Sequence, residues 1–109
     1  MKKLILLFLL ISSIVNAQSF YPFCEDCQVV DHTYYSLCYD EKNEQSKWVA
    51  YNLTAENVNT KVCEREDNFR IDPKVNTGSA NLSDYKGSGY DRGHLCPAAD
   101  MRFDCEAML

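Results

Sequence analysis

The sequence predicts an α+β domain built on an antiparallel sheet, and three observations support this prediction. Residues 29–39 are rich in aromatic and β-branched side chains, which favour strands. Residues 48–53 form a second apolar run, and the polar residues 40–47 between the two runs predict a β-hairpin with a long loop. From Pro97 onward the composition turns helical. A sheet followed by helical chain is the order expected of the α+β class.

Residues 1–17 have the order of a secretory signal peptide. A charged start is followed by an apolar run over residues 4–11 and by small residues up to Ala17. This run is shorter than the ~20 apolar residues of a membrane span, so an N-terminal anchor is the less favoured alternative. We therefore expect cleavage near Ala17, a secreted or periplasmic protein without stable membrane association, and a folded part over residues 18–109.

Six cysteines follow the expected cleavage point: Cys24, Cys27, Cys38, Cys63, Cys96 and Cys105. An even number in a small exported domain predicts disulfide bonds, although the sequence does not decide which pairs form. The Cys24-x-x-Cys27 pair is also compatible with half of a zinc site or with a redox pair. No second pair of this kind completes a set of four ligands, so disulfides are the favoured interpretation.

The chain is acidic, with 11 Lys and Arg against 16 Asp and Glu and a net charge of −5, and loss of Lys2 and Lys3 with the signal makes it more negative. Affinity for a polyphosphate comes mainly from Lys and Arg that displace counterions. This composition argues against a general nucleic-acid-binding protein. If the substrate is a nucleic acid, the attraction has to be local, through a few arginines and a divalent cation, or to come from basic residues elsewhere.

The segment Asp91-Arg92-Gly93-His94 places an acid, an arginine and an imidazole side by side, close to Gly87 and Gly89. Histidine accepts a proton near neutral pH, and arginine binds phosphate through two parallel hydrogen bonds. The density of glycine allows close approach of the backbone to a bulky or charged group. These residue types suit phosphodiester hydrolysis, whereas a surface ion pair beside a loop histidine is the alternative for these four residues alone.

The four residues resemble the signature of the DNA/RNA non-specific endonucleases, which are ββα-metal nucleases. The similarity covers residues 32 to 101 in the family's order. Besides the signature it includes His32-x-x-Tyr35-Ser36-Leu37-Cys38-Tyr39, Trp48-Val49-Ala50-Tyr51-x-Leu53-Thr54, Phe69-Arg70-x-Asp72-Pro73, Asp84-Tyr85 and Pro97-Ala98-Ala99-Asp100-Met101. The resemblance implies a ββα-metal active-site motif within the α+β fold.

The resemblance also implies roles for individual residues. His94 matches the general base that takes a proton from the attacking water, and Arg92 matches the arginine that contacts the substrate phosphate. Asp91 would brace the loop or hydrogen-bond water around the metal. Arg65 resembles a second phosphate-binding arginine, at a spacing to Asp72 that varies in the family.

The resemblance further implies one Mg²⁺, held by an asparagine side chain and waters. That asparagine and a following catalytic glutamate are expected beyond Leu109, so no metal ligand is assigned in this chain. Residues 18–109 are then expected to be the N-terminal part of the domain, truncated after the signature and inactive alone.

Two further expectations concern His32 and one pair of cysteines. His32 is expected to be a packed or hydrogen-bonded structural histidine, on a strand far from the signature. A local disulfide between Cys96 and Cys105 is one pairing that would brace the signature loop.

Two functions from different classes follow. The first is a secreted, metal-dependent endonuclease that hydrolyses DNA and RNA with little sequence preference, because contacts to phosphate carry no base identity. The alternative is a disulfide-braced secreted binding module of nuclease ancestry without catalytic activity. The intact signature favours the enzyme, and the unassigned metal ligand favours the binding module.

Overall fold

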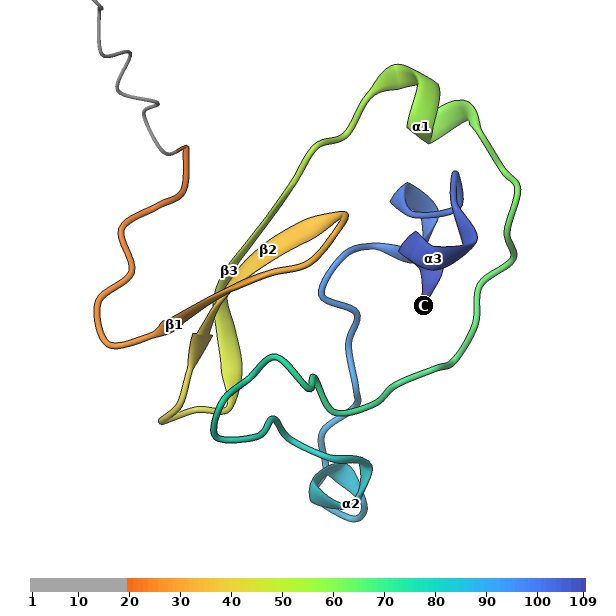
Figure 1. The fold of residues 1–109 in the computed structure, drawn as a ribbon. Helices are drawn as coiled ribbons and strands as arrows, with labels where there is room; N and C mark the ends of the chain where they lie inside the picture. Colours follow the sequence, from red (N-terminus) through yellow and green to blue (C-terminus); the bar gives the residue numbers. More distant parts are fainter. Residues whose placement is uncertain (1–19) are drawn as a thin grey trace, which may run out of the picture.

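The computed structural model describes residues 20–109, so the predicted signal peptide lies outside the described residues. A three-stranded antiparallel sheet in the order β1-β2-β3 is its most regular part (Figure 1). No helix among the described residues is long and apolar enough to cross a membrane. The elements are β1 (Gln28–Asp31), β2 (Tyr35–Asp40), β3 (Gln45–Tyr51), α1 (Ala55–Asn59), α2 (Leu82–Tyr85), a 3₁₀ turn (Ala98–Asp100) and α3 (Cys105–Met108). This sheet with short helices agrees with the predicted α+β class.

The sheet differs from the predicted hairpin in two ways. The run at 29–39 is not one strand, because it reverses at residues 32–34 and its halves pair with each other as β1 and β2. The predicted long loop is a tight turn. In this turn the carboxylate of Asp40 accepts hydrogen bonds from the backbone N of Lys42 at 3.1 Å and from the amide of Asn43 at 2.6 Å. The polar residues therefore bond to one another within a short connection.

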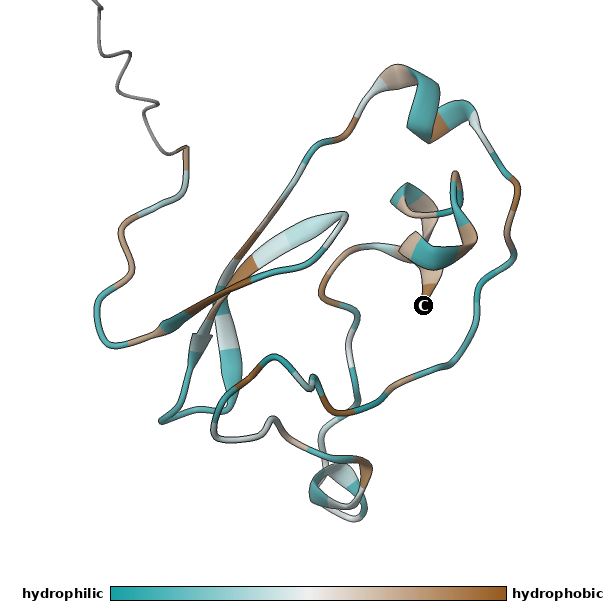
Figure 2. Ribbon diagram, in the orientation of Figure 1, coloured by the Kyte–Doolittle hydropathy of each residue, from teal (hydrophilic) through white to brown (hydrophobic). Residues whose placement is uncertain are grey.

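The hydrophobic core lies on one face of this sheet. Val30, Leu37, Tyr39 and Val75 are its buried members, and Tyr35 and Val49 pack against them. Hydrophobic colouring lies along the paired β1 and β2, whereas the β2–β3 turn is hydrophilic (Figure 2). Because Val75 comes from a loop, the core joins the sheet to a segment far along the chain.

The loop over residues 72–79 is docked on β1 and β2. Gln28 donates its side-chain amide to the carbonyl of Lys74 at 2.7 Å and accepts from the backbone N of Asn76 at 2.9 Å. Val75 lies between these two bonds and is only 4 % exposed. The Gln28 side chain thus satisfies two backbone groups of the loop, and the loop buries the apolar Val75 against the sheet. These contacts also position the chain segment that leads into the loop.

The C-terminal turns lie against the chain that follows α1. The carbonyl of Arg102 accepts hydrogen bonds from the backbone N of Val62 at 2.9 Å and of Cys63 at 3.2 Å. The Arg102 guanidinium also pairs with Glu64 at 2.8 Å. These contacts place Cys63 beside Cys105, with Cα atoms 5.3 Å apart, and the two form a disulfide.

The suggested Cys96–Cys105 pairing is therefore wrong. Proximity in sequence suggested it, but the backbone pairing at Arg102 brings Cys63, 42 positions away, to Cys105 instead. Cys96 points into the interior and is a free thiol. The general expectation of disulfide bonding is confirmed at Cys63–Cys105.

The helical tendency after Pro97 gives two short pieces rather than one helix. The 3₁₀ turn is tied to the sheet because the Tyr51 hydroxyl donates to the Asp100 carboxylate at 2.8 Å. The helix α3 starts separately, capped by Asp104, whose carboxylate accepts from the backbone N of Glu106 at 2.7 Å. The hydrogen bond at Asp100 and the helix cap at Asp104 therefore separate the 3₁₀ turn from α3.

The disulfide assignment predicts a non-additive stability effect. Cys63→Ser and Cys105→Ser should each lower the free energy of unfolding by about 2–4 kcal/mol, because either change opens the same loop in the unfolded chain. The double variant should lose little more than each single one. Urea unfolding of the exported chain measures all three values, and additive losses would contradict the pairing.

Candidate active site

The signature residues lie in an irregular loop that follows α2. Asn81 caps this helix and forms a reciprocal capping box with Asp84. The chain then turns through Gly87 at φ 74° and Gly89 at φ 83°, a backbone conformation that L side chains rarely adopt. A Cβ atom built at either glycine meets nothing within 4 Å, so turn geometry explains these glycines within the chain.

The Phe69 ring brings two predicted site residues together. His94 lies edge-on to this ring, with centroids 4.9 Å apart and planes at 65°. The guanidinium carbon of Arg92 lies 4.9 Å from the same ring centroid. Edge-to-face and cation–π contacts of this kind are favourable. Phe69 is half-buried, whereas Arg92 and His94 are exposed. The guanidinium and the imidazole that contact the Phe69 ring are therefore accessible to solvent.

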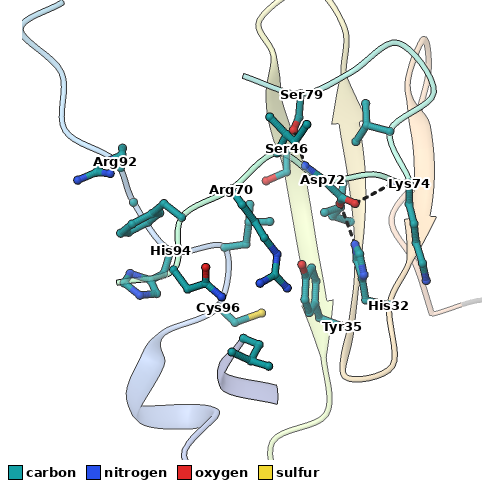
Figure 3. Close-up of a pocket in the computed structure, with 18 of the residues that line it drawn as sticks. His32, Tyr35, Ser46, Arg70, Asp72, Lys74, Ser79, Arg92, His94 and Cys96 are labelled. Carbon is teal, nitrogen blue, oxygen red and sulfur yellow. Dashed lines mark hydrogen bonds and ion pairs between the residues drawn. The ribbon is translucent and has the colours of Figure 1, made fainter. Parts of the chain in front are cut away.

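These three side chains line a cleft of about 520 Å³ (Figure 3). Arg70 points into the same cleft, near Tyr35. Two guanidinium groups and an imidazole therefore contribute to the lining of one cleft on an acidic chain. The Lys74 ammonium and four carboxylates, those of Glu44, Glu66, Asp72 and Glu106, also line the cleft, so its wall carries charges of both signs.

A histidine–aspartate hydrogen bond and a stacked ring form another part of the cleft wall. His32 Nε2 lies 2.8 Å from Asp72 Oδ2, and the His32 ring stacks on Tyr35 at 4.7 Å. The second oxygen of Asp72 accepts from the backbone N of Lys74 at 2.9 Å. Burial, followed by the nearby Asp72 charge, raises the pKa of Tyr35 to about 12, so its hydroxyl stays protonated at neutral pH.

The prediction for His32 is confirmed in one respect and wrong in another. The side chain is packed and hydrogen-bonded, as expected of a structural histidine. It does not lie on a strand, because residue 32 is in the β1–β2 turn, and it lines the same cleft as His94 but on the other side of it (Figure 3). The reversal of the chain at residues 32–34 places it there.

The other two predicted residues do not line this cleft. Asp91 lines a second depression of about 370 Å³ together with Lys86 and Tyr90, and Arg92 borders both. Arg65 is exposed and pairs with Asp67 at 3.2 Å, and it lines neither depression. The structure thus brings Arg92 and His94 together on one ring, places Asp91 in a depression that it shares with Arg92 alone of these two, and leaves Arg65 outside both depressions.

Two residues of the cleft were given no role from the sequence. Phe69 and Arg70 belong to the quoted Phe69-Arg70-x-Asp72-Pro73 motif, so the signal was present. An apolar ring has no site chemistry of its own, and its importance becomes visible only through the two side chains that it contacts.

Comparison with known proteins identifies the family. A family model described as DNA/RNA non-specific endonuclease matches residues 15–109. The chain belongs to this family. The resemblance seen in the Asp91-Arg92-Gly93-His94 motif is thereby confirmed.

Individual relatives of this nuclease family support the assignment. Endonuclease G, mitochondrial, of Homo sapiens is 41% identical over 75 residues, covering 68% of this chain and 25% of that protein. A nuclease of Nostoc sp. is 41% identical over 68 residues, covering 61% and 24%. Nuclease 1, mitochondrial, of Schizosaccharomyces pombe is 40% identical over 83 residues, covering 74% and 26%. The chain thus spans about a quarter of the length of these relatives. No solved structure matches it significantly.

The cleft also predicts how Cys96 reacts. Burial, followed by the charge of Asp100, raises the pKa of the Cys96 thiol to about 11. The thiolate is the reactive form, so iodoacetamide should leave Cys96 unmodified at about pH 8 in the folded chain and modify it in urea. Peptide mass spectrometry measures the modified fraction, and complete modification of the folded chain would contradict the buried, neutral thiol.

Proposed function

We propose that this chain supplies the proton acceptor and the phosphate-binding arginines of an exported, Mg²⁺-dependent nuclease that hydrolyses DNA and RNA at a ββα-metal site. Membership of the non-specific endonuclease family supports a nucleic acid substrate. The observation that carries the residue assignment is the placement of Arg92 and His94 on one aromatic ring beside a cleft.

His94 is proposed as the general base. Its exposed ring can reach water, and neutral imidazole accepts a proton near neutral pH. The edge-on contact with Phe69 restricts how the exposed ring turns. An attacking water that loses its proton to His94 becomes the nucleophile for the phosphorus atom.

Arg92 is proposed to hold the scissile phosphate, and Arg70 is the other arginine of the cleft. A guanidinium offers two parallel N–H donors to phosphate oxygens. Contacts that go only to phosphate give little sequence preference. Asp91 is proposed to brace the loop or order water. Arg65 stays a proposed phosphate contact, and its ion pair with Asp67 would have to open first.

The proposed Mg²⁺ rests on the family motif. Among residues 20–109, the His, Cys, Asp and Glu side chains that lie close enough in threes to hold a metal are Cys24, Cys27 and Cys38. Magnesium prefers oxygen ligands, so this thiol group does not suit it. The same group of three cysteines does not include His94 or any other residue that lines the cleft. We accordingly expect the 109-residue chain alone to show no Mg²⁺-dependent cleavage.

Export to a secreted or periplasmic location is also a proposal. The order of residues 1–17 and the Cys63–Cys105 disulfide support it, because such bonds persist in oxidising compartments. Two of the relatives carry the word mitochondrial in their names, so the family occurs in more than one setting.

The catalytic assignment predicts the effect of removing the base. His94→Ala in the full-length protein should lower turnover by ~10²–10⁴ without loss of folding, which is the range usual for a general base. Cleavage of plasmid DNA and of RNA should also stop in excess chelator. The control is Lys61→Ala, an exposed change outside the cleft. Turnover of His94→Ala within a few-fold of the parent would remove His94 from the mechanism, and undiminished cleavage in chelator would remove the metal.

The Phe69 contacts predict a positioning effect. Phe69→Leu should lower kcat/KM by about 10-fold, because a lost cation–π contact is worth roughly 1 kcal/mol and the His94 ring becomes less fixed. Phe69→Tyr keeps an aromatic ring and should restore most of the rate. Steady-state kinetics with a defined oligonucleotide and a thermal transition for each variant are the measurements. Equal rates for the leucine and tyrosine variants would contradict the role of the ring.

A further inference from the structure

Three cysteines from separate parts of the chain converge beside the sheet, away from the residues that line the cleft. Cys24 and Cys27 flank a bend before β1, and Cys38 lies in the central strand β2. Their Sγ atoms all lie within 4.8 Å of one another. Cys38 is fully buried, and the other two are half-buried. The sequence showed only the Cys24-x-x-Cys27 pair, and the third thiol comes from the fold.

The backbone does not single out one pair of these cysteines. The Cα separations are 5.9 Å for Cys24–Cys27, 6.5 Å for Cys24–Cys38 and 5.8 Å for Cys27–Cys38. Each lies inside the range of roughly 4.4–6.8 Å that disulfides use. A sulfur atom forms a single S–S bond, so any disulfide here leaves the third thiol without a partner. A shared metal ion is the one bonding arrangement that uses all three sulfurs together.

The surroundings hold the three thiols in place. Asp26 adopts a φ of 54°, and this left-handed residue bends the chain between Cys24 and Cys27. The Lys47 ammonium on β3 donates to the carbonyl of Glu25 at 2.9 Å, which fixes the bend against the sheet. It also places a positive charge near the site, where three thiolates and one divalent ion would carry a net negative charge.

We propose that Cys24, Cys27 and Cys38 bind one Zn²⁺ through their Sγ atoms. Thiolates are soft ligands, which zinc accepts and magnesium does not. Zn–S bonds of about 2.3 Å would hold tetrahedral sulfur ligands roughly 3.8 Å apart. The structure places the three Sγ atoms in disulfide contact with one another, so zinc binding needs all three in the reduced form and moved apart to this spacing. Three thiols release three protons to solvent on binding. No fourth His, Cys, Asp or Glu ligand joins the group among the described residues, so the fourth position is left to water.

This zinc ion would fasten the segment before β1 to the central strand. It is independent of the proposed nuclease chemistry, since none of the three cysteines lines the cleft that holds His94. The site is structural in position, and its loss should change stability and metal content before it changes any reaction.

The test measures the zinc content of the exported chain, residues 18–109 after the expected cleavage, purified without chelator from zinc-supplemented cells. Elemental analysis should give one Zn²⁺ per chain, and exchange for Co²⁺ should give a thiolate-to-cobalt charge-transfer absorption band. Cys27→Ser and Cys38→Ser should reduce the zinc content to about a tenth or less, since each removes a ligand. Cys96→Ser, which changes the buried free thiol, is the matched control and should keep its zinc.

Two results would overturn the site. One is a zinc-free chain in which peptide mapping without reductant finds Cys38 linked to Cys24 or Cys27. The other is zinc content that Cys38→Ser leaves unchanged. If the serine variants do not fold, the zinc content and the cobalt spectrum of the parent chain decide the question. A parent chain with neither bound zinc nor a thiolate-to-cobalt band would contradict the proposal.

Discussion

The docking of residues 72–79 on the sheet is the constraint on which the cleft depends. Val75 completes the core and Gln28 satisfies two backbone groups of the loop, so the segment has one stable position. Phe69 lies just before this loop, and its ring in turn contacts Arg92 and His94. A short sheet therefore controls the placement of side chains in an irregular loop that has no regular backbone hydrogen bonding of its own.

The cleft also shows how an acidic chain can attract a polyanion. Arg70 and Arg92 both line it, and the Asp72 carboxylate in its wall is hydrogen-bonded to His32 and to the backbone N of Lys74. A carboxylate that already accepts hydrogen bonds repels an approaching phosphate less than a free one would. The local field, rather than the net charge of −5, is what a phosphate group would meet.

Periodicity and composition predicted the apolar runs and the α+β class, because strand-forming side chains are concentrated at 29–39 and 48–53. They failed at the reversal of residues 32–34, where no Gly, Pro or Asn signals a turn. The motif found Arg92 and His94, which carry their chemistry in their own side chains. Disulfide pairing and the role of Phe69 depend on contacts between distant segments, and no local pattern contains that information.

The bond between Cys63 and Cys105 has a topological consequence. It closes a covalent ring, and the cleft side chains Phe69, Arg70, Arg92 and His94 all belong to the ring, whereas the sheet lies outside it. Reduction of this one disulfide would increase the conformational freedom of the whole loop from Cys63 to Cys105 in the unfolded ensemble. The thiol–disulfide balance of the surroundings would then affect the segment that carries the arginines and the imidazole as one unit, although neither Cys63 nor Cys105 lines the cleft.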